Sequence, residues 1–347
     1  MKPTSISLLR IMNDSQSGRW LTLLPLLLLL GGVVLPANVF AAPPNPSPVT
    51  ITVNCPGGSI NTTLASLDPS ADNTIQVSGA CTENVDIESF DRLTLVALGV
   101  ASISDASGGA TAVLSINDST RVTVQGFTIN GNGPSGQSEL IDCTASSCTF
   151  RGNTVQGGGS DGVDVFNGAR AFFINDVFQD LGTGGLFGPT GIFVGGNSLA
   201  SVRGVTIQRV TGDGVQVSGG AFLVVRDSVV QHNAGSGIFL NLDGTANIRH
   251  STITGNTGDG IDVTGHSTIS LGAVGAAADA SSITGNRGVG ILVKDLSFAR
   301  FPQGVPNVVK NNLGRKDVLC SPQFPATRGV HTSIGGGKTN CDEDDER

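Results

Sequence analysis

The chain has 347 residues, and its 20 Lys and Arg against 28 Asp and Glu give a net charge of −8 at pH 7. A surface of this sign repels nucleic acid and anionic lipid at long range, so neither is an expected partner. Length and composition favour a single elongated domain.

The first 41 residues have the pattern of a signal peptide. Three basic residues precede or flank an apolar run from Leu21 to Leu35, and a small-residue cleavage pattern ends at Ala41. We expect residues 1–41 to be removed. The mature protein would then be secreted or periplasmic, with no membrane anchor.

Residues 42–83 are expected to cap the start of the folded domain. Within this segment Ile60, Leu64 and Leu67 recur at helical spacing behind Ser59, and serine is a favourable residue at the start of a helix. The pattern predicts a short amphipathic helix.

A five-residue motif recurs six times between residues 160 and 293. Each copy has a small residue or carboxylate (once a valine), then Gly, a β-branched residue, any residue and an aliphatic residue. The motif glycines are Gly162, Gly191, Gly214, Gly237, Gly260 and Gly290. The three intervals between Gly191 and Gly260 are equal, whereas the first and last intervals are longer. A period of about 23 residues is typical of a solenoid, in which each unit stacks on the next.

One repeat contains three short apolar runs, at residues 215–217, 222–225 and 228–230, separated by Gly, Ser, Asp and Asn. Each run has the length and composition of a β-strand, and no helical period is present. The sequence therefore predicts an all-β fold: a single-stranded right-handed parallel β-helix of about ten turns, with about 23 residues and three short strands per turn. The predicted N-terminal capping helix precedes it.

With this repeat, residues 84–310 resemble the right-handed parallel β-helix proteins of the pectin-lyase-like superfamily. The resemblance implies the fold but leaves the activity open, because lyases, hydrolases, epimerases and adhesins share it. After residue 310 the repeat ends. Residues 311–347 are expected to form a polar tail that finishes in the acidic run 342–346.

All six cysteines lie in the predicted mature chain, where an even count indicates disulfides. The expected pairs are Cys55 with Cys81, Cys143 with Cys148, and Cys320 with Cys341. The alternative is a zinc site, which is disfavoured because there is no Cys-x-x-Cys pair and the four histidines are scattered. We expect no metal and no cofactor.

Residues one period apart in a β-helix lie above one another, so the repeat alignment serves as a distance map. The residues before the motif glycines are acidic only on every second turn, at Asp161, Asp213 and Asp259, which are about 9–10 Å apart. The outward acids Asp164 and Asp262 are separated by four turns. We therefore expect no clustered acids of the kind that bind metal in uronate lyases. The Asp-Gly pairs are interpreted as turn residues that bond backbone N–H groups.

Arg203, Arg226 and Arg249 recur at the same spacing as the central motif glycines, each after an inward aliphatic residue, and predict an outward column that Arg151 would extend. Like charges about 5 Å apart repel by about 1–3 kcal/mol even near water, so another group must neutralise them. One interpretation is Asp227 together with solvent. The other is an anionic ligand such as a uronate chain, whose carboxylates arginine binds bidentately.

Two further groups of residues are candidate sites. Asp243 and His266 share a column on adjacent turns and are weak candidates for acid–base catalysis, with no nucleophile or second base beside them. Phe166, Phe193 and Phe239 are candidates for stacking on sugars, although the predicted mature chain contains neither Trp nor Tyr.

The sequence favours a monomeric secreted scaffold or binding protein. Its expected partner is an acidic polysaccharide or another cell-surface component, and no catalytic constellation is evident. One alternative is a polysaccharide lyase or epimerase whose site uses residues within 130–147, 181–190 or 272–280. Another is a self-associating surface adhesin, because stacked strands can pair end to end.

Overall fold

The computed structural model describes residues 47–132, 138–182, 188–314, 316–320, 327–328 and 341. The predicted signal peptide, the acidic run 342–346 and most of the predicted tail lie outside these residues. Within the described part, no helix is long and apolar enough to cross a bilayer.

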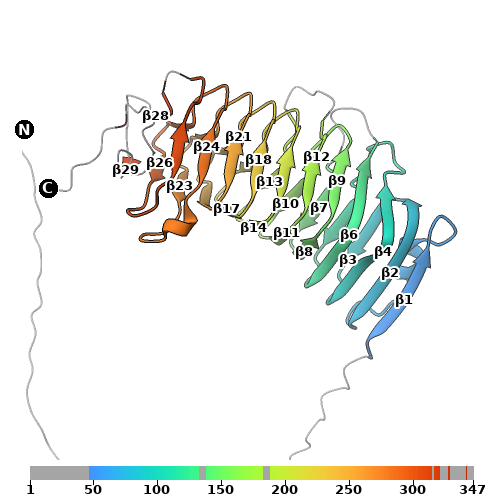
Figure 1. Ribbon diagram of the computed structural model, residues 1–347. Helices are drawn as coiled ribbons and strands as arrows, with labels where there is room; N and C mark the ends of the chain where they lie inside the picture. Colours follow the sequence, from blue (N-terminus) through green and yellow to red (C-terminus); the bar gives the residue numbers. More distant parts are fainter. Residues whose placement is uncertain are drawn as a thin grey trace, which may run out of the picture. The chain divides into compact units, whose positions relative to one another are not determined.

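The described chain is an all-β parallel solenoid of about 11 turns with almost no helix (Figure 1). One wall is a 10-stranded parallel sheet that receives one short strand from each successive turn. Its strands are β3 (Val85–Glu88), β5 (Leu114–Asn117), β7 (Ile141–Thr144), β10 (Val163–Phe166), β13 (Ile192–Val194), β16 (Val215–Val217), β19 (Ile238–Leu240), β22 (Ile261–Val263), β25 (Ile291–Val293) and β28 (Val318–Cys320).

The other sheet of the solenoid has 19 strands. It begins with four strands, β1 (Val49–Asn54), β2 (Asn73–Thr82), β4 (Leu93–Ser104) and β6 (Val122–Gly131), and then divides into two stacks. The first stack contains β8 (Ser147–Arg151), β11 (Arg170–Ile174), β14 (Leu199–Arg203), β17 (Phe222–Arg226), β20 (Thr245–Arg249), β23 (Thr268–Leu271), β26 (Phe298–Arg300) and β29 (Thr327–Arg328). The second contains β9 (Thr154–Gly157), β12 (Val177–Gln179), β15 (Thr206–Gln208), β18 (Val229–Gln231), β21 (Thr252–Thr254), β24 (Ser282–Thr284) and β27 (Val308–Lys310).

The turns of the solenoid differ in length. Ile192 pairs with Val215, Val215 with Ile238, and Ile238 with Ile261, all at the same separation in sequence. The turns from Val163 to Ile192 and from Ile261 to Ile291 are longer. The predicted period therefore describes only part of the stack. Parallel pairing also extends beyond residues 84–310, from β1 at one end to β28 and β29 at the other.

Inward side chains of successive turns form one continuous apolar core. In the 10-stranded sheet, Val215, Ile238 and Ile261 stack in register and are fully buried. The motif glycine before each of these residues is required by close packing. A Cβ on Gly214 would lie 2.6 Å from the carbonyl oxygen of Gly237 on the next turn, and real Cβ atoms do not approach an oxygen so closely. The same contact recurs along the column of motif glycines.

A buried ladder of asparagines runs through one corner of the core. The side-chain amide of Asn233 donates to Asn256 Oδ1 at 3.0 Å, Asn256 donates to Asn286 at 2.9 Å, and Asn286 donates to Asn312 at 2.9 Å. Each amide oxygen also accepts from the backbone N–H of the asparagine one turn earlier, as from Asn233 to Asn256 at 3.1 Å. The ladder satisfies polar backbone groups that would otherwise be buried without partners.

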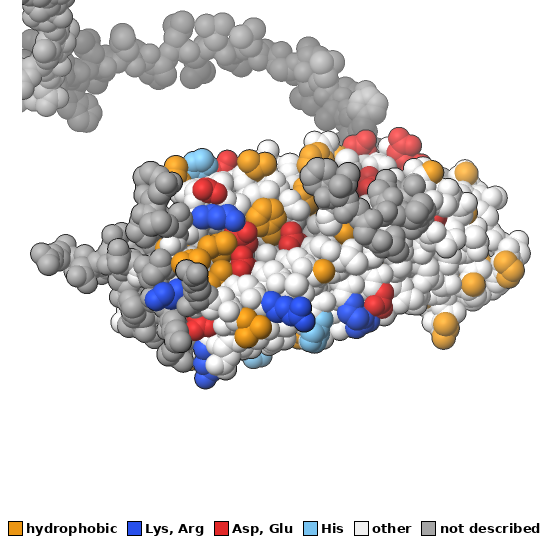
Figure 2. All heavy atoms as spheres, turned by 90° about the horizontal axis from the view of Figure 1, so that it is seen from above, with side chains coloured by type: hydrophobic (Ala, Val, Ile, Leu, Met, Phe, Trp, Pro, Cys, Tyr) orange, Lys and Arg blue, Asp and Glu red, His pale blue; other side chains and the backbone are white. Residues whose placement is uncertain are grey.

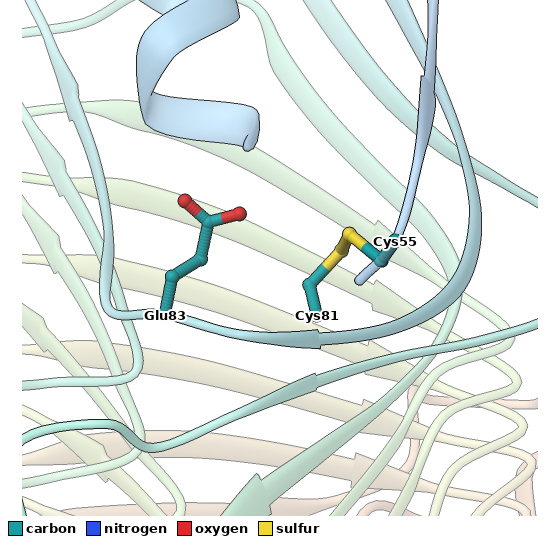
Figure 3. Close-up of side chains that lie close together, drawn as sticks. All are labelled: Cys55, Cys81 and Glu83. Carbon is teal, nitrogen blue, oxygen red and sulfur yellow. A yellow bond between two sulfur atoms is a disulfide. The ribbon is translucent and has the colours of Figure 1, made fainter. Parts of the chain in front are cut away.

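Three disulfides join the predicted pairs, Cys55–Cys81, Cys143–Cys148 and Cys320–Cys341. Near the first lies the helix α1 (Ile60–Leu64), whose first turn is bound by the Glu83 carboxylate (Figure 3). That carboxylate accepts the backbone N–H of Ile60 at 2.8 Å and the Ser59 hydroxyl at 2.9 Å. A second short helix, η1 (Ala277–Asp279), is a single 3-10 turn.

Candidate functional site

The predicted arginine column is present over three consecutive strands. Arg203, Arg226 and Arg249 are register partners at the ends of β14, β17 and β20. Arg151 lies in the same register column, although Ile174 of β11 occupies the position between Arg151 and Arg203.

Acidic residues neutralise part of this column, as one of the two interpretations expected. Asp227 Oδ2 lies 3.6 Å from Arg203 Nε and 3.4 Å from Arg226 Nε, while Arg249 Nη1 lies 3.8 Å from Asp279. A hydrogen bond from His250, with the charge of Arg226, holds the pKa of Asp227 below its ordinary value.

Asp243 and His266 lie on neighbouring turns in the exposed loop that follows the 10-stranded sheet, where the Asp243 N–H donates to the carbonyl of Gly265 at 2.9 Å. Both residues are described, and no hydrogen bond or ion pair joins their side chains. The geometry therefore shows adjacency but no proton-transfer contact between them.

The predicted phenylalanines point outward from the 10-stranded sheet. Phe193 stacks with Phe166 of the preceding turn, with ring centroids 6.4 Å apart and planes at 25°. Phe239 is separated from Phe193 by one strand, on which Gln216 occupies the shared column. Phe166 is 46% exposed, so the stacked pair presents an open aromatic face.

Next to this aromatic pair lies a group of acids that the sequence reasoning missed, which we call the carboxyl cluster: Glu139, Asp142, Asp161 and Asp164. Asp142 of β7 and Asp164 of β10 are register partners on adjacent strands. Asp161 precedes Asp164 on the same turn and hydrogen-bonds to it. The segment with Glu139 is held alongside, because Leu140 N–H donates to the carbonyl of Asp161 at 2.9 Å. Acids on neighbouring turns therefore do lie together at this place, which the distance map built from the motif copies did not show.

The cluster escaped detection because the alignment of motif copies began at residue 160. Ile141-Asp142-Cys143 has the same inward-outward-inward pattern as Val163-Asp164-Val165, although it lacks the preceding glycine. Extending the outward column toward the N-terminus, through Asp142, Ser115 and Asp86, would have found it. Residues 139 and 142 lie within the stretch 130–147 that the sequence indicated as a possible source of site residues.

Burial and mutual repulsion raise the pKa values of the carboxyl cluster. Burial raises the pKa of Glu139, Asp142 and Asp161. Burial, followed by the charges of Asp161 and Glu139, raises the pKa of Asp164 to about 9. At neutral pH the Asp161–Asp164 pair therefore holds a proton, and one carboxyl can donate while the other accepts.

The remaining Asp-Gly acids have the structural role that was predicted for them. Asp213 Oδ1 accepts the N–H of Ser236 at 2.6 Å, and Asp259 Oδ1 accepts that of Val289 at 2.7 Å. Asp161 makes the equivalent bond to Thr190. These carboxylates join each turn to the next.

The carboxyl cluster is not spaced as a ready metal site. Among the described residues, only Cys55, Cys81 and Glu83 bring three possible ligand atoms within 4.8 Å of one another. The two sulfurs of that group are joined in a disulfide (Figure 3), so they do not ligate a metal as thiolates.

A groove of about 390 Å³ adjoins the cluster and is lined by Asp86, Ser115, Asn117, Glu139 and Asp142 among others. Viewed from above (Figure 2), acidic and hydrophobic side chains are interspersed on the surface of the solenoid. The groove, the cluster and the Phe166–Phe193 pair follow one another along the outer face of the 10-stranded sheet.

We expect the unfolding free energy to fall as the pH rises from about 5 to about 9. In this window the folded state retains the Asp164 proton, because its pKa is raised from 3.8 to about 9, whereas the unfolded state has released it. The stabilisation is complete below the unfolded pKa and is lost as the pH rises through the folded pKa, at up to about 1.4 kcal/mol per pH unit. Urea unfolding midpoints across this range measure the slope.

Asp164→Asn should flatten this fall above neutral pH, because the amide stays uncharged. Asp86→Asn, at an exposed position of the same outward column, is the matched control and should leave the slope unchanged. A wild-type midpoint that rises between neutral and alkaline pH would contradict the proposed protonation of Asp164.

Comparison with known proteins supports the architecture. The family model described as "Right handed beta helix region" matches residues 111–274. The A-module of a mannuronan C-5 epimerase from Azotobacter vinelandii is similar in structure at 12% identity, with a TM-score of 0.56, over 78% of this chain and 88% of that chain. A pectate lyase is similar at 14% identity, with a TM-score of 0.55, over 86% and 79%. A protein of Geobacillus virus E2 gives 11% identity, a TM-score of 0.54, and coverage of 76% and 57%.

Comparison with curated protein sequences finds no significant match. At these identities the structural likeness establishes the fold and leaves the activity open. The repeat, the stacked parallel sheets and the family match lead to one conclusion. The chain folds as a right-handed parallel β-helix, the fold that it shares with a pectate lyase and a mannuronan C-5 epimerase.

Proposed function

We propose that this protein binds a polysaccharide along the outer face of the 10-stranded sheet. The observation that supports this best is the open Phe166–Phe193 pair beside the carboxyl groups of Asp142 and Asp164. Sugar rings have apolar faces, which pack on aromatic rings, and hydroxyl edges, which hydrogen-bond to carboxyl groups. Because the cluster holds several acids, this face favours a glycan without carboxylates over them.

Titration calorimetry with a panel of neutral oligosaccharides tests this proposal. Phe166→Ala and Phe193→Ala should each weaken binding by about tenfold or more, which corresponds to about 1.4 kcal/mol. Phe298→Ala is the matched control, since Phe298 is partly exposed but projects from β26 in the other sheet. Absence of binding to the whole panel, or equal effects of Phe298→Ala and Phe166→Ala, would refute the proposed surface.

A polysaccharide lyase or epimerase is the second candidate, and the Asp161–Asp164 carboxyl pair favours it. A pair that shares one proton near neutral pH can both give and take a proton, as general acid–base catalysis requires. The similarity in fold to a pectate lyase and a mannuronan C-5 epimerase supports testing this chemistry. If wild type forms unsaturated uronate ends from uronate polymers and Asp164→Asn lowers the rate at least about 100-fold, this candidate stands.

We also propose that α1 closes the N-terminal end of the core. Ile60 is fully buried and Leu64 is 5% exposed, so both apolar side chains of the helix cover the first turn. The Cys55–Cys81 disulfide and the Glu83 contacts hold the segment in place. Such a cover would keep the open end of the stack from pairing with another chain.

The three disulfides support an oxidising compartment, and we propose a secreted or periplasmic protein. Removal of residues 1–41, a monomeric state and the roles of Asp243 and His266 stay predictions.

A further inference from the structure

A second surface of the solenoid, away from the 10-stranded sheet, has the features of an anion-binding site. We call it the arginine strip: Arg203, Arg226 and Arg249, at the ends of β14, β17 and β20 in the 19-stranded sheet. The three residues are register partners, so their backbones are separated by the strand spacing of about 4.8 Å. This basic row lies on a chain whose net charge is −8.

The ion pairs of the strip leave guanidinium donors open. Arg203 and Arg226 share a single carboxylate oxygen, Asp227 Oδ2, at 3.6 and 3.4 Å. The other oxygen of Asp227 is occupied by His250 Nδ1 at 2.7 Å. One carboxylate therefore faces two arginines and a histidine, and within the described chain neither arginine side chain makes a hydrogen bond.

Arg209 of the same protein forms, by contrast, a closed ion pair, that is, a pair in which one carboxylate accepts two hydrogen bonds from one guanidinium group. Arg209 donates to the Asp180 carboxylate through Nε at 2.6 Å and through Nη2 at 2.9 Å. Its charge and its best donors are therefore used internally. The Arg203 and Arg226 side chains are 68% and 51% exposed, and their donors face solvent. This contrast distinguishes the arginine strip from an ordinary surface ion pair.

Apolar side chains lie beside the strip on the same outward face. Phe222 of β17 is 37% exposed, and Phe172 of β11 is 39% exposed. Val224, between Phe222 and Arg226 on β17, also points outward and is half-buried. On the other side of the strip a groove of about 370 Å³ is lined by Asp227, His250 and a row of hydroxyl side chains.

We propose that the arginine strip binds a linear acidic polysaccharide that runs along the solenoid axis across β14, β17 and β20. Its carboxylates would pair with the open guanidinium donors of Arg203 and Arg226, and the strand-to-strand repeat is comparable to one sugar ring of an extended chain. The exposed phenylalanines provide apolar contact for ring faces, and the outward hydroxyls of Thr252 and Ser282 in the groove provide hydrogen bonds at the other edge. The site is separate from the glycan face in the proposed function and does not depend on it.

Binding of an oligogalacturonate, measured by calorimetry at low and at moderate salt, tests this proposal. Arg226→Ser should weaken binding at least tenfold, and the Arg203→Ser, Arg226→Ser, Arg249→Ser triple variant should abolish it together with its salt dependence. Asp227→Asn should strengthen binding, because it removes the acid that competes for Arg203 and Arg226. Arg209→Ser removes an equal charge from a closed pair and should leave the affinity unchanged.

Several outcomes would overturn the proposal. The first is that the wild type binds no uronate oligosaccharide, and the second is that the triple variant binds it with wild-type affinity. The third is that Arg209→Ser loses as much affinity as Arg226→Ser. The fourth is that the wild type binds single-stranded DNA equally strongly, which would indicate attraction to polyanions in general. Unchanged melting temperatures of the variants confirm that folding is intact. Phe166→Ala should leave oligogalacturonate binding unaffected, so failure here and failure of the neutral-glycan face are distinguishable.

Discussion

Ile238→Asp is expected to destabilise the solenoid by at least about 4–5 kcal/mol. Ile238 is fully buried in the core and is stacked between Val215 and Ile261 of the adjacent turns. A carboxylate at this position would lie among the apolar side chains of the core and must either remain charged at low dielectric or take up a proton. Circular dichroism melting, or the urea midpoint, measures the loss.

Thr245→Asp is the matched control for this substitution. Thr245 belongs to the same turn but points outward, between Phe222 and Thr268, where water solvates the new charge. We expect a change below about 1 kcal/mol. If Ile238→Asp does not yield folded protein, Ile238→Ala should still cost about 2–5 kcal/mol through the cavity it leaves. If either Ile238 variant unfolds at the same midpoint as the wild type, the assignment of this column to the inward face is wrong.

Asn256→Ala is expected to cost about 3–5 kcal/mol, although it removes only one small polar side chain. The Asn256 amide oxygen accepts both the backbone N–H and the side-chain amide of Asn233, at 3.1 and 3.0 Å. Its own amide donates to Asn286 Oδ1 at 2.9 Å and to the carbonyl of Val230 at 3.3 Å. Two buried donors would lose their acceptor in a site that is closed to water, at about 1–3 kcal/mol each, and a small cavity would remain.

The outer ladder of glutamines provides the control for Asn256→Ala. Gln231 donates to Gln208 Oε1 at 2.9 Å, and Gln208 donates to Gln179 at 3.1 Å, but these amides are only partly buried. In Gln208→Ala, water can replace the lost partner, and we expect a cost below about 1 kcal/mol. If the two variants lose equal amounts of unfolding free energy, burial is not the reason that the asparagine ladder contributes to stability.

The periodic features of this chain were predictable from its residues. The recurrence of Gly214, Gly237 and Gly260 predicted which residues stack, because each glycine admits the carbonyl oxygen of the next turn. The arginine column followed from the same period, with which Asn233 and Asn256 of the asparagine ladder also recur. The disulfides could be paired because the cysteines fall in three well-separated groups.

Which side chains lie beside a column of stacked residues depends on parts of the sequence that do not follow the repeat. Glu139 immediately precedes β7 and Asp142 lies on it, so both meet Asp161 and Asp164 of the next turn, although this strand lacks the motif glycine. The pKa of Asp164 likewise depends on how deeply its carboxyl is buried among these acids.

Local pattern therefore determined the β-helix and its inward and outward faces, because backbone hydrogen bonds between successive turns impose one register on all of them. The spacing of the cysteines determined their pairs. Tertiary structure alone decided which charges are satisfied. Among the residues that the structure describes, Asp180 pairs with Arg209 alone, whereas Asp227 is divided among Arg203, Arg226 and His250, and burial beside Asp161 raises the pKa of Asp164. Burial and side-chain distance, which vary from turn to turn, control these interactions, and sequence spacing does not specify them.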